Sequence, residues 1–301
     1  MKKILALLLA CVMLLSFLVS CDETGDTAGT GNGGDQSGSG ESEKPEANPA
    51  SDFEYGEHSD GGISIKKYIG TSKNVVIPSE INGLPVTLIG GDAFTCREDI
   101  ESVVIPDTVQ IIAPWAFYAC RNLKTVDFGE GVLEIHEHAF ERCSALEKII
   151  LPPKLETIGA EAFYGCSSAA EIFIPKTLKN WNSSFRYGIF EDCTSLKTLA
   201  IEEGLESFGA YGEFTGASSL ETVTFPKSLK KLGTADFHGV TTLQYVVFLG
   251  DAPETGAVPF GTVGEGSQTV NPNLVIYYDP TTQGWDETPL REYNLVPIGQ
   301  K

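Results

Sequence analysis

The sequence predicts an α/β, β-rich, right-handed solenoid in which short parallel strands and short helical turns recur about every 23 residues. Phenylalanines recur along the middle of the chain with gaps of 23, 23, 23, 27, 24 and 23 residues. They are Phe94, Phe117, Phe140, Phe163, Phe190, Phe214 and Phe237. An apolar residue follows each of them six residues later, and a short alternating apolar run begins three residues after that. No single repeat can cover its own apolar side, so stacking of neighbouring repeats drives folding.

Residues 1–20 have the features of a lipoprotein signal peptide. Lys2 and Lys3 precede an uncharged apolar stretch over residues 4–19, which is shorter than the roughly 20 residues of a membrane-spanning helix. The stretch ends in Leu18-Val19-Ser20-Cys21, which resembles the bacterial lipobox. We therefore expect cleavage before Cys21 and lipidation of its thiol. Ordinary cleavage with release and a retained membrane anchor are the alternatives.

Residues 21–52 are predicted to be a flexible, lipidated tether. The segment from 22 to 50 contains seven glycines and seven acidic residues, and it lacks Val, Ile, Leu, Met and aromatic residues. Such a composition cannot bury enough apolar surface to offset the entropy lost on ordering.

The copy over residues 149–163 justifies the elements of one repeat in order. Ile149-Ile150-Leu151 alternates as a short strand does, and Pro152, which lacks an N–H donor, ends it. A second apolar pair, Leu155 with Ile158, lines the opposite wall. A glycine then permits a turn with positive φ, as expected at Gly90, Gly159, Gly209 and Gly233. The Ala-Phe segment that follows is predicted to be a short helical turn whose ring fills the interior.

These residues resemble the leucine-rich repeat of BspA-like bacterial surface proteins. The shared pattern is an Ile-Pro strand end, then Val-x-x-Ile-Gly, then Ala-Phe-x-x-Cys-x-x-Leu, as at residues 116–123, 139–146 and 162–169. The resemblance covers residues 62–248, and it implies a leucine-rich-repeat solenoid that serves extracytoplasmic binding or adhesion, with no catalytic residues. We place the solenoid at residues 53–250 and a C-terminal cap at 251–301.

Four cysteines hold equivalent repeat positions: Cys120, Cys143, Cys166 and Cys193. Stacking at about 4.8 Å per coil would bring their thiols together inside the solenoid. We expect buried free thiols that act as small hydrophobes, with disulfides as the alternative. Cys96 follows its phenylalanine by two residues rather than three, so it falls outside this column.

Charge and motifs exclude several classes of function. The net charge of −20 would repel a phosphate backbone, so we expect no nucleic-acid partner. The sequence has no G-x-S-x-G, H-E-x-x-H or P-loop motif, so we expect no enzyme and no cofactor. Glu134, His136, Glu137 and His138 crowd together, but a solvated turn explains them better than a metal site.

The outward column of the strand face is the first candidate site. It runs through Val76, Val104, Asp127, Ile150, Phe173, Ala200, Thr224 and Val247, and the next column includes Tyr245. A solvated sheet face should be polar, yet five of these eight are large and apolar. We predict ligand binding at Val104, Asp127, Ile150, Phe173, Thr224, Tyr245 and Val247. Strand propensity alone, or coverage by the N-terminal segment, would also explain the pattern.

The second candidate is the insertion in the repeat between Phe163 and Phe190, which is four residues longer than its neighbours and contains Trp181, Phe185 and Tyr187. These aromatic rings could stack on sugars. Alternatively, the insertion packs on itself.

Together these features predict a lipid-anchored protein of the bacterial cell envelope that faces outside the cytoplasm. We expect it to bind an extracellular protein or another macromolecule in adhesion or recognition. A carbohydrate-binding accessory lipoprotein of a glycan-uptake system is the alternative. Contact with the membrane is expected through the lipid anchor only.

Overall fold

The computed structural model describes residues 45–183, 187–264 and 267–299, so Cys21 and Phe185 lie outside the described residues. From Glu46 onward these residues belong to one compact unit. Asn48 is already part of that unit, because its N–H donates to the Val76 carbonyl and its side-chain oxygen accepts from the Val76 N–H. No helix in the described ranges has the length and apolarity needed to cross a membrane.

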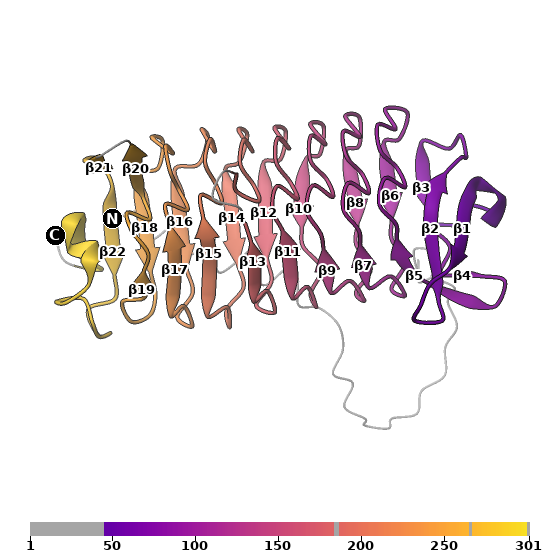
Figure 1. The fold of residues 1–301 in the computed structure, drawn as a ribbon. Helices are drawn as coiled ribbons and strands as arrows, with labels where there is room; N and C mark the ends of the chain where they lie inside the picture. Colours follow the sequence, from indigo (N-terminus) through magenta and orange to yellow (C-terminus); the bar gives the residue numbers. More distant parts are fainter. Residues whose placement is uncertain (1–44, 184–186, 265–266, 300–301) are drawn as a thin grey trace, which may run out of the picture. The chain divides into compact units, whose positions relative to one another are not determined.

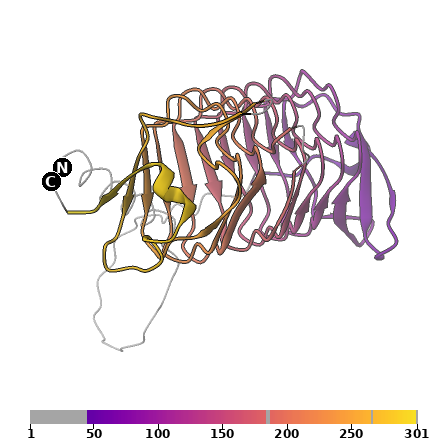
Figure 2. The ribbon, with the colours of Figure 1, turned by 60° about the vertical axis from the view of Figure 1, so that its left-hand side comes forward.

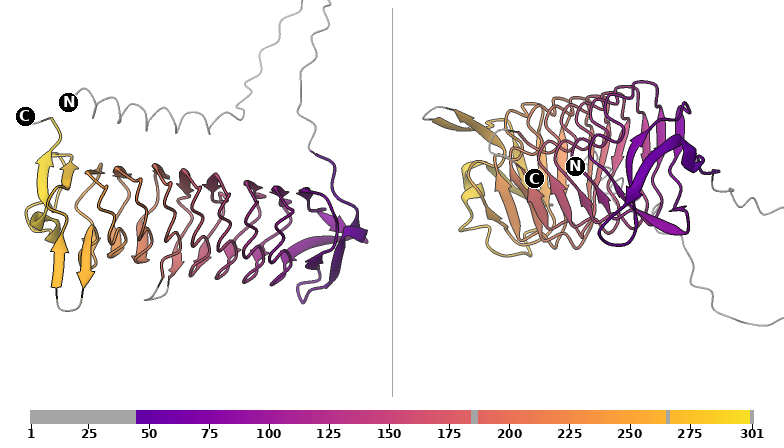
Figure 3. Two further views of the ribbon diagram at one scale, coloured as in Figure 1. Left: turned by 90° about the horizontal axis from the view of Figure 1, so that it is seen from above. Right: turned by 45° about the vertical axis from the view of Figure 1, so that its right-hand side comes forward.

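The unit is a stack of coils that follow one another in sequence order (Figures 1 and 2). Most coils contribute one strand to each of two stacks of parallel strands, which lie on different sides of the coils (Figure 3). The first stack contains β3 (Asn74–Val76), β6 (Ser102–Val104), β8 (Thr125–Asp127), β10 (Lys148–Ile150), β12 (Glu171–Ile174), β14 (Thr198–Ile201), β16 (Thr222–Phe225) and β18 (Tyr245–Phe248). The second contains β5 (Leu84–Ile89), β7 (Ile111–Ile112), β9 (Glu134–Ile135), β11 (Thr157–Gly159), β13 (Asn180–Asn182), β15 (Ser207–Tyr211), β17 (Lys231–Thr234) and β19 (Glu254–Thr255).

Irregular elements close both ends of the stack. At the N-terminal end, the 3-10 turn η1 (Ala50–Asp52) leads into β1 (Phe53–Glu57), which pairs antiparallel with β2 (Ile63–Tyr68), and β4 (Glu80–Ile81) pairs antiparallel with β5. At the C-terminal end, β20 (Gly261–Gly264) and β21 (Ser267–Val270) form a hairpin. β22 (Val275–Tyr278) and β23 (Asn294–Pro297), with η2 (Pro289–Glu292) before β23, extend the first stack beyond β18.

The third side of each coil consists of turns, so the predicted helical turns are wrong. The described residues contain only the two short 3-10 segments as helix. Trp115 and Ala119 adopt left-handed φ angles of 56° and 54°, which interrupt any helical hydrogen-bond pattern. Alternate backbone N–H groups point to the next coil: Phe117 donates to the Ala139 carbonyl at 2.7 Å and Ala119 to Glu141 at 2.8 Å, whereas Tyr118 between them donates within the turn. The sequence period marks these positions but does not reveal the direction of their N–H groups.

A column of phenylalanine rings fills the interior, as predicted. The seven repeat phenylalanines stack with successive centroids 4.6, 4.8, 5.1, 5.6, 5.2 and 5.3 Å apart. Tyr68 extends the column at one end and Phe260 at the other, each with its centroid 5.4 Å from the neighbouring ring. Full burial of one such side chain stabilises the fold by about 2–3 kcal/mol.

The repeat glycines serve close packing more than left-handed backbone. Only Gly209, with a φ of 69°, has the positive φ predicted for the four turn glycines. A Cβ on Gly90 would lie 2.7 Å from the Ile65 carbonyl oxygen, and one on Gly233 would lie 2.8 Å from the Ala210 nitrogen. A Cβ on Gly159 would meet the backbone of Glu137. The neighbouring coil leaves no room for a side chain at these positions.

The cysteine column forms as predicted, with free thiols. Each buried Sγ donates to a phenylalanine carbonyl of the preceding coil, at distances of 3.0 to 3.6 Å; the donors are Cys120, Cys143, Cys166 and Cys193. Cys96 is exposed, and Arg97 takes the place of a cysteine in its coil. The Arg97 guanidinium donates to the carbonyls of Tyr68 and Gly70, both at 2.7 Å. It thereby closes the column at its N-terminal end.

The strand ladders are interrupted at three places. The first stack is divided into the sheets β3-β6-β8, β10-β12-β14 and β16-β18-β22-β23. The second stack breaks between β13 and β15. The coil with β14 and β15 therefore shares a ladder with the preceding coil only through β14, and with the following coil only through β15. The break between β8 and β10 creates the candidate site.

Candidate binding surface

The predicted outward column forms three runs of neighbouring side chains. Strand register places Val76, Val104 and Asp127 side by side, then Ile150, Phe173 and Ala200, then Thr224, Val247 and Tyr277. We call this side of the first stack the strand face. The repeat pattern therefore identified which side chains are adjacent on it.

Exposure varies along the strand face. Ile150 is exposed at 39%, whereas Val104, Phe173 and Thr224 are half-buried. Val247 was predicted to be available to a ligand, and this is wrong because its exposure is only 6%. The next strand places the large ring of Tyr277 directly beside it. Tyr245, in the adjacent column, is exposed.

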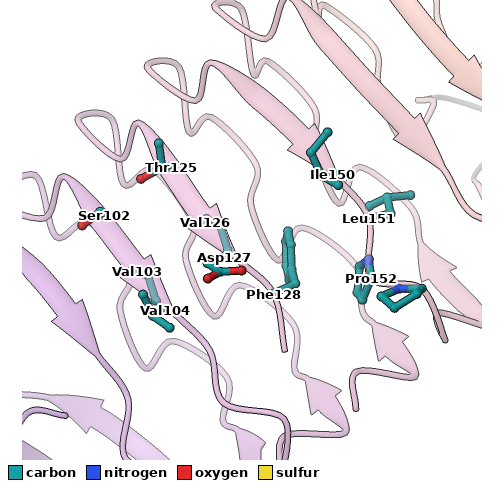
Figure 4. Close-up of a pocket in the computed structure, with 11 residues that line it drawn as sticks. Ser102, Val103, Val104, Thr125, Val126, Asp127, Phe128, Ile150, Leu151 and Pro152 are labelled. Carbon is teal, nitrogen blue, oxygen red and sulfur yellow. The ribbon is translucent and has the colours of Figure 1, made fainter. Parts of the chain in front are cut away.

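A cleft of about 440 Å³ opens where the ladder between β8 and β10 is interrupted (Figure 4). At intact junctions, the residue after each strand donates across to the next strand, as Ile105 does to the Asp127 carbonyl at 2.8 Å. Within the described residues, Phe128 makes no such bond to Ile150. Gly129 packs against Pro106 of the preceding coil, whereas Pro152 begins the loop of the next coil without an N–H to donate. The two loops therefore diverge.

The β8–β10 cleft is apolar with one carboxylate. Its walls include Val104, Phe128, Ile150 and Leu151, and Asp127 also lines it. No partner for the Asp127 carboxylate occurs in the described part of the chain. Phe128 holds the repeat position of the buried Leu151 but is itself half-buried, because the cleft opens onto it. Its ring meets Phe140 edge-on at 5.5 Å, so the cleft rests on the phenylalanine column.

Paired charges lie beside the strand face. Glu101 accepts from Lys73 at 3.2 Å and from Lys124 at 2.8 Å, and Lys148 pairs with Glu171 at 2.8 Å. Hydrogen bonding from Lys124 and Lys73 lowers the pKa of Glu101 below its usual value. An apolar row beside paired charges, with one carboxylate left unpaired, favours an apolar group that carries a positive charge.

The two described aromatic residues of the insertion, Trp181 and Tyr187, lie in different surroundings. Trp181 is 7% exposed on β13, its ring packs on Phe208 at 5.1 Å, and its indole N–H donates to the Ser207 carbonyl. It occupies the interior position that Ile158 holds on β11. Tyr187 is exposed and contacts Tyr164 on the turn side. The prediction that Trp181 is available to a ligand is wrong, because the ring fills the core.

The two histidines of the segment 134–138 make separate contacts. Glu134 pairs with His136 at 2.8 Å. His138 turns instead toward Glu141 and Glu161, neither of which the sequence had linked to it. Glu161 belongs to the next coil, so only the coil register could have indicated this contact.

Comparison with known proteins agrees with the repeat pattern. A family model described as the BspA type leucine rich repeat region matches six copies, over residues 87–209 and 177–260. The matched residues make up more than half of the chain. No curated protein matches it.

Several solved structures share the fold. A leucine-rich repeat protein of T. pallidum is 29% identical, with a TM-score of 0.53 and coverage of 70% of this chain and 85% of that one. A leucine rich cell surface protein of Faecalibacterium prausnitzii is 22% identical, with a TM-score of 0.54 and coverage of 80% and 72%. A leucine-rich repeat protein of Bacteroides ovatus is 21% identical, with a TM-score of 0.50 and coverage of 75% and 70%. The last two likenesses support the fold alone.

Proposed function

The chain belongs to the BspA-type leucine-rich-repeat family, and we propose that it binds an extracellular protein along its strand face, with the β8–β10 cleft as the anchor point. Leucine-rich repeats generally serve recognition or adhesion rather than catalysis, and BspA-type proteins are typically bacterial surface proteins. The observation that carries the proposal is the apolar cleft at the break between β8 and β10 in the first stack.

The cleft suits one large side chain of a partner. Its volume of about 440 Å³ falls in the range of small-ligand pockets. Burying a leucine- or phenylalanine-sized group there contributes about 2–3 kcal/mol, which is the scale of an interface hot spot. Asp127 and the net charge of −20 favour a partner that is locally basic, and the same charge disfavours nucleic acid.

We further propose that Cys21 carries a lipid and that the segment between Cys21 and Glu46 holds the solenoid away from the membrane. The lipobox-like ending and the polar composition of the segment support this. Metabolic labelling with an alkyne fatty acid tests it. Incorporation in the wild-type chain and its loss in Cys21→Ala is the expected result; equal labelling of both would contradict it.

The carbohydrate-binding alternative has lost its main support. It depended on aromatic rings available for stacking on sugars, and Trp181 is committed to the core. A protein partner is therefore the better-supported proposal.

The decisive experiment compares two variants, Ile150→Asp in the cleft and Leu133→Asp outside it. Ile150 (39% exposed) lines the cleft, and Leu133 (37% exposed) lies outside the strand face, immediately before β9. Binding of the full chain to immobilised extracellular-matrix proteins and to a glycan array is measured for the wild type, Ile150→Asp and Leu133→Asp. We expect Ile150→Asp to weaken protein binding about tenfold or more. Leu133→Asp should have little effect. Equal losses in both variants, or binding confined to glycans, would overturn the proposal.

A further inference from the structure

A histidine and two carboxylates converge on the turn side of two consecutive coils. Nδ1 of His138 lies 2.7 Å from Oε2 of Glu141 and 3.6 Å from Oε2 of Glu161. All three atoms lie within 4.8 Å of one another. We call these three residues the His138 cluster. It lies apart from the β8–β10 cleft, whose lining contains none of its members.

The coil register fixes where these side chains point. His138 and Glu161 occupy the same position in successive coils, and both adopt a left-handed φ of 58°. The Phe140 N–H donates to the Ala162 carbonyl at 2.7 Å and so joins the two turns. Glu141 follows Phe140 directly. The cluster is therefore built on two rigid turns rather than on flexible loops.

Neighbouring side chains restrain the ligating groups. The ring of Trp115, from the preceding coil, stacks on His138 at 5.1 Å with an interplanar angle of 6°. Nε of Arg142 lies 3.3 Å from Oε1 of Glu141, which leaves the other oxygen directed toward His138. Glu141 is buried, and the Glu161 side chain is only 17% exposed. Arg142 lies within salt-bridge distance of Glu141, whereas the ring nitrogen of His138 lies close to both carboxylates.

We propose that the His138 cluster binds a divalent transition-metal ion of the Zn²⁺ type. Imidazole nitrogen with carboxylate oxygen is a donor set that suits Zn²⁺, Co²⁺ and Ni²⁺ better than Ca²⁺ or Mg²⁺, which prefer oxygen ligands. Ligand atoms around a tetrahedral Zn²⁺ lie about 3.4 Å apart, since each bond is about 2.0–2.2 Å. The separations of 2.7 and 3.6 Å bracket that value, so small side-chain rotations would admit the ion.

The ion would connect two successive coils. His138 and Glu141 belong to one coil and Glu161 to the next, so coordination adds a cross-link to the hydrogen bond between Phe140 and Ala162. Both His138 and Glu161 are partly open to solvent, so a fourth ligand can enter from outside. This inference does not depend on the proposed function.

The chain supplies its own control. Within the described residues, His136 pairs with Glu134 and not with Glu161; it is also partly exposed and lies two residues from His138. If the histidines bound metal through general surface charge, replacing either one would have the same effect.

The experiment titrates the metal-free full chain with Zn²⁺ by calorimetry, with excess Mg²⁺ present to occupy exposed carboxylates. We expect one site that is weakened tenfold or more in His138→Ala and Glu161→Gln and is retained in His136→Ala. The absorption spectrum of the Co²⁺-loaded chain should lack an intense sulfur charge-transfer band, which excludes the exposed Cys96 as a ligand. Circular dichroism verifies that each variant is folded, and Glu161→Gln keeps the shape of the side chain.

Three results would overturn the inference. The first is the absence of a Zn²⁺ site in the presence of Mg²⁺. The second is a site that survives in both His138→Ala and Glu161→Gln. The third is a site that His136→Ala weakens as much as His138→Ala does.

Discussion

Glu213 and Asp236 occupy the same position in successive coils, directly before the phenylalanine of each, and both are fully buried. The Phe214 N–H donates to the Asp236 carbonyl at 2.7 Å, which joins the two coils at this point. Two earlier coils place Ala139 and Ala162 at the equivalent position. The interior position before the phenylalanine is therefore alanine in those earlier coils and a carboxylate in the two adjacent coils that contain Glu213 and Asp236.

Asp236→Ala should stabilise the protein at neutral pH. Burial, reinforced by the charge of Glu213, raises the pKa of Asp236 well above its usual 3.8 despite the nearby Gly233 N–H. Neither carboxylate oxygen has a hydrogen bond within the described residues. The folded protein therefore holds this proton more tightly than the unfolded chain, and stability falls as pH rises above the unfolded-state pKa of about 3.9.

We expect the variant to gain about 1–3 kcal/mol in free energy of unfolding at pH of about 7, the usual cost of an unsatisfied buried polar group. The gain should shrink as the pH falls to about 3, where the carboxyl is mostly protonated in both states. Denaturant unfolding followed by circular dichroism across this pH range is the measurement. A gain that is the same at both ends would contradict the titration.

Glu213→Ala should have the opposite sign. The Glu213 carboxylate accepts from the N–H groups of Ile189, Ala210 and Tyr211, at 3.0, 3.1 and 3.4 Å. Removing it takes this acceptor from the buried Ile189 N–H and from two part-buried N–H groups, so we expect a loss of about 1–3 kcal/mol. The same unfolding measurement compares it directly with Asp236→Ala. Two variants that shift stability in the same direction would refute this division of roles.

Trp181→Ala should destabilise the fold, because the ring packs on Phe208 and its N–H is bonded to Ser207. Large-to-small changes of buried aromatic residues cost about 3–5 kcal/mol. Tyr187→Ala is the control, since Tyr187 belongs to the same insertion and is 42% exposed. Thermal melting should show a marked drop for Trp181→Ala only. An unchanged melting temperature for Trp181→Ala would restore a ligand role for this residue.

Of the described cysteines, only Cys96 should react with a thiol reagent in the native protein. The other four are fully buried, and burial raises the pKa of the Cys143, Cys166 and Cys193 thiols. Both effects slow alkylation, since the thiolate is the reactive form. Peptide mapping after iodoacetamide treatment, with and without denaturant, identifies the labelled residues. Native labelling of Cys143 would indicate that the coils open.

The periodicity of the sequence was sufficient to predict the columns of the solenoid. Phe140, Cys143 and the outward Ile150 all lie where the repeat places them, because a fixed period puts equivalent residues in register on adjacent coils. It could not predict that the turns are non-helical, since that depends on where backbone N–H groups find acceptors. The glycines at 159, 209 and 233 were predicted to lie in turns but lie in strands, where the neighbouring coil leaves little room for a side chain.

The candidate site depends on departures from the repeat, which are harder to predict. The β8–β10 cleft lies where no backbone hydrogen bond joins Phe128 to Ile150 in the described part of the chain. The sequence contains both residues, but the missing bond appears only when two coils are stacked. Trp181 looked like an exposed aromatic for a related reason: the insertion concealed that it continues the interior column after Ile158.

The coil that contains β14 and β15 has a mechanical consequence. Because it shares a ladder with each neighbour on one side only, it should twist more easily than the coils around it. Inter-coil bonds act in series when the molecule is stretched from end to end, so the weakest junction gives way first. A load along the solenoid would therefore separate the stack first at the coil that contains β14 and β15, and the coils on either side would stay intact.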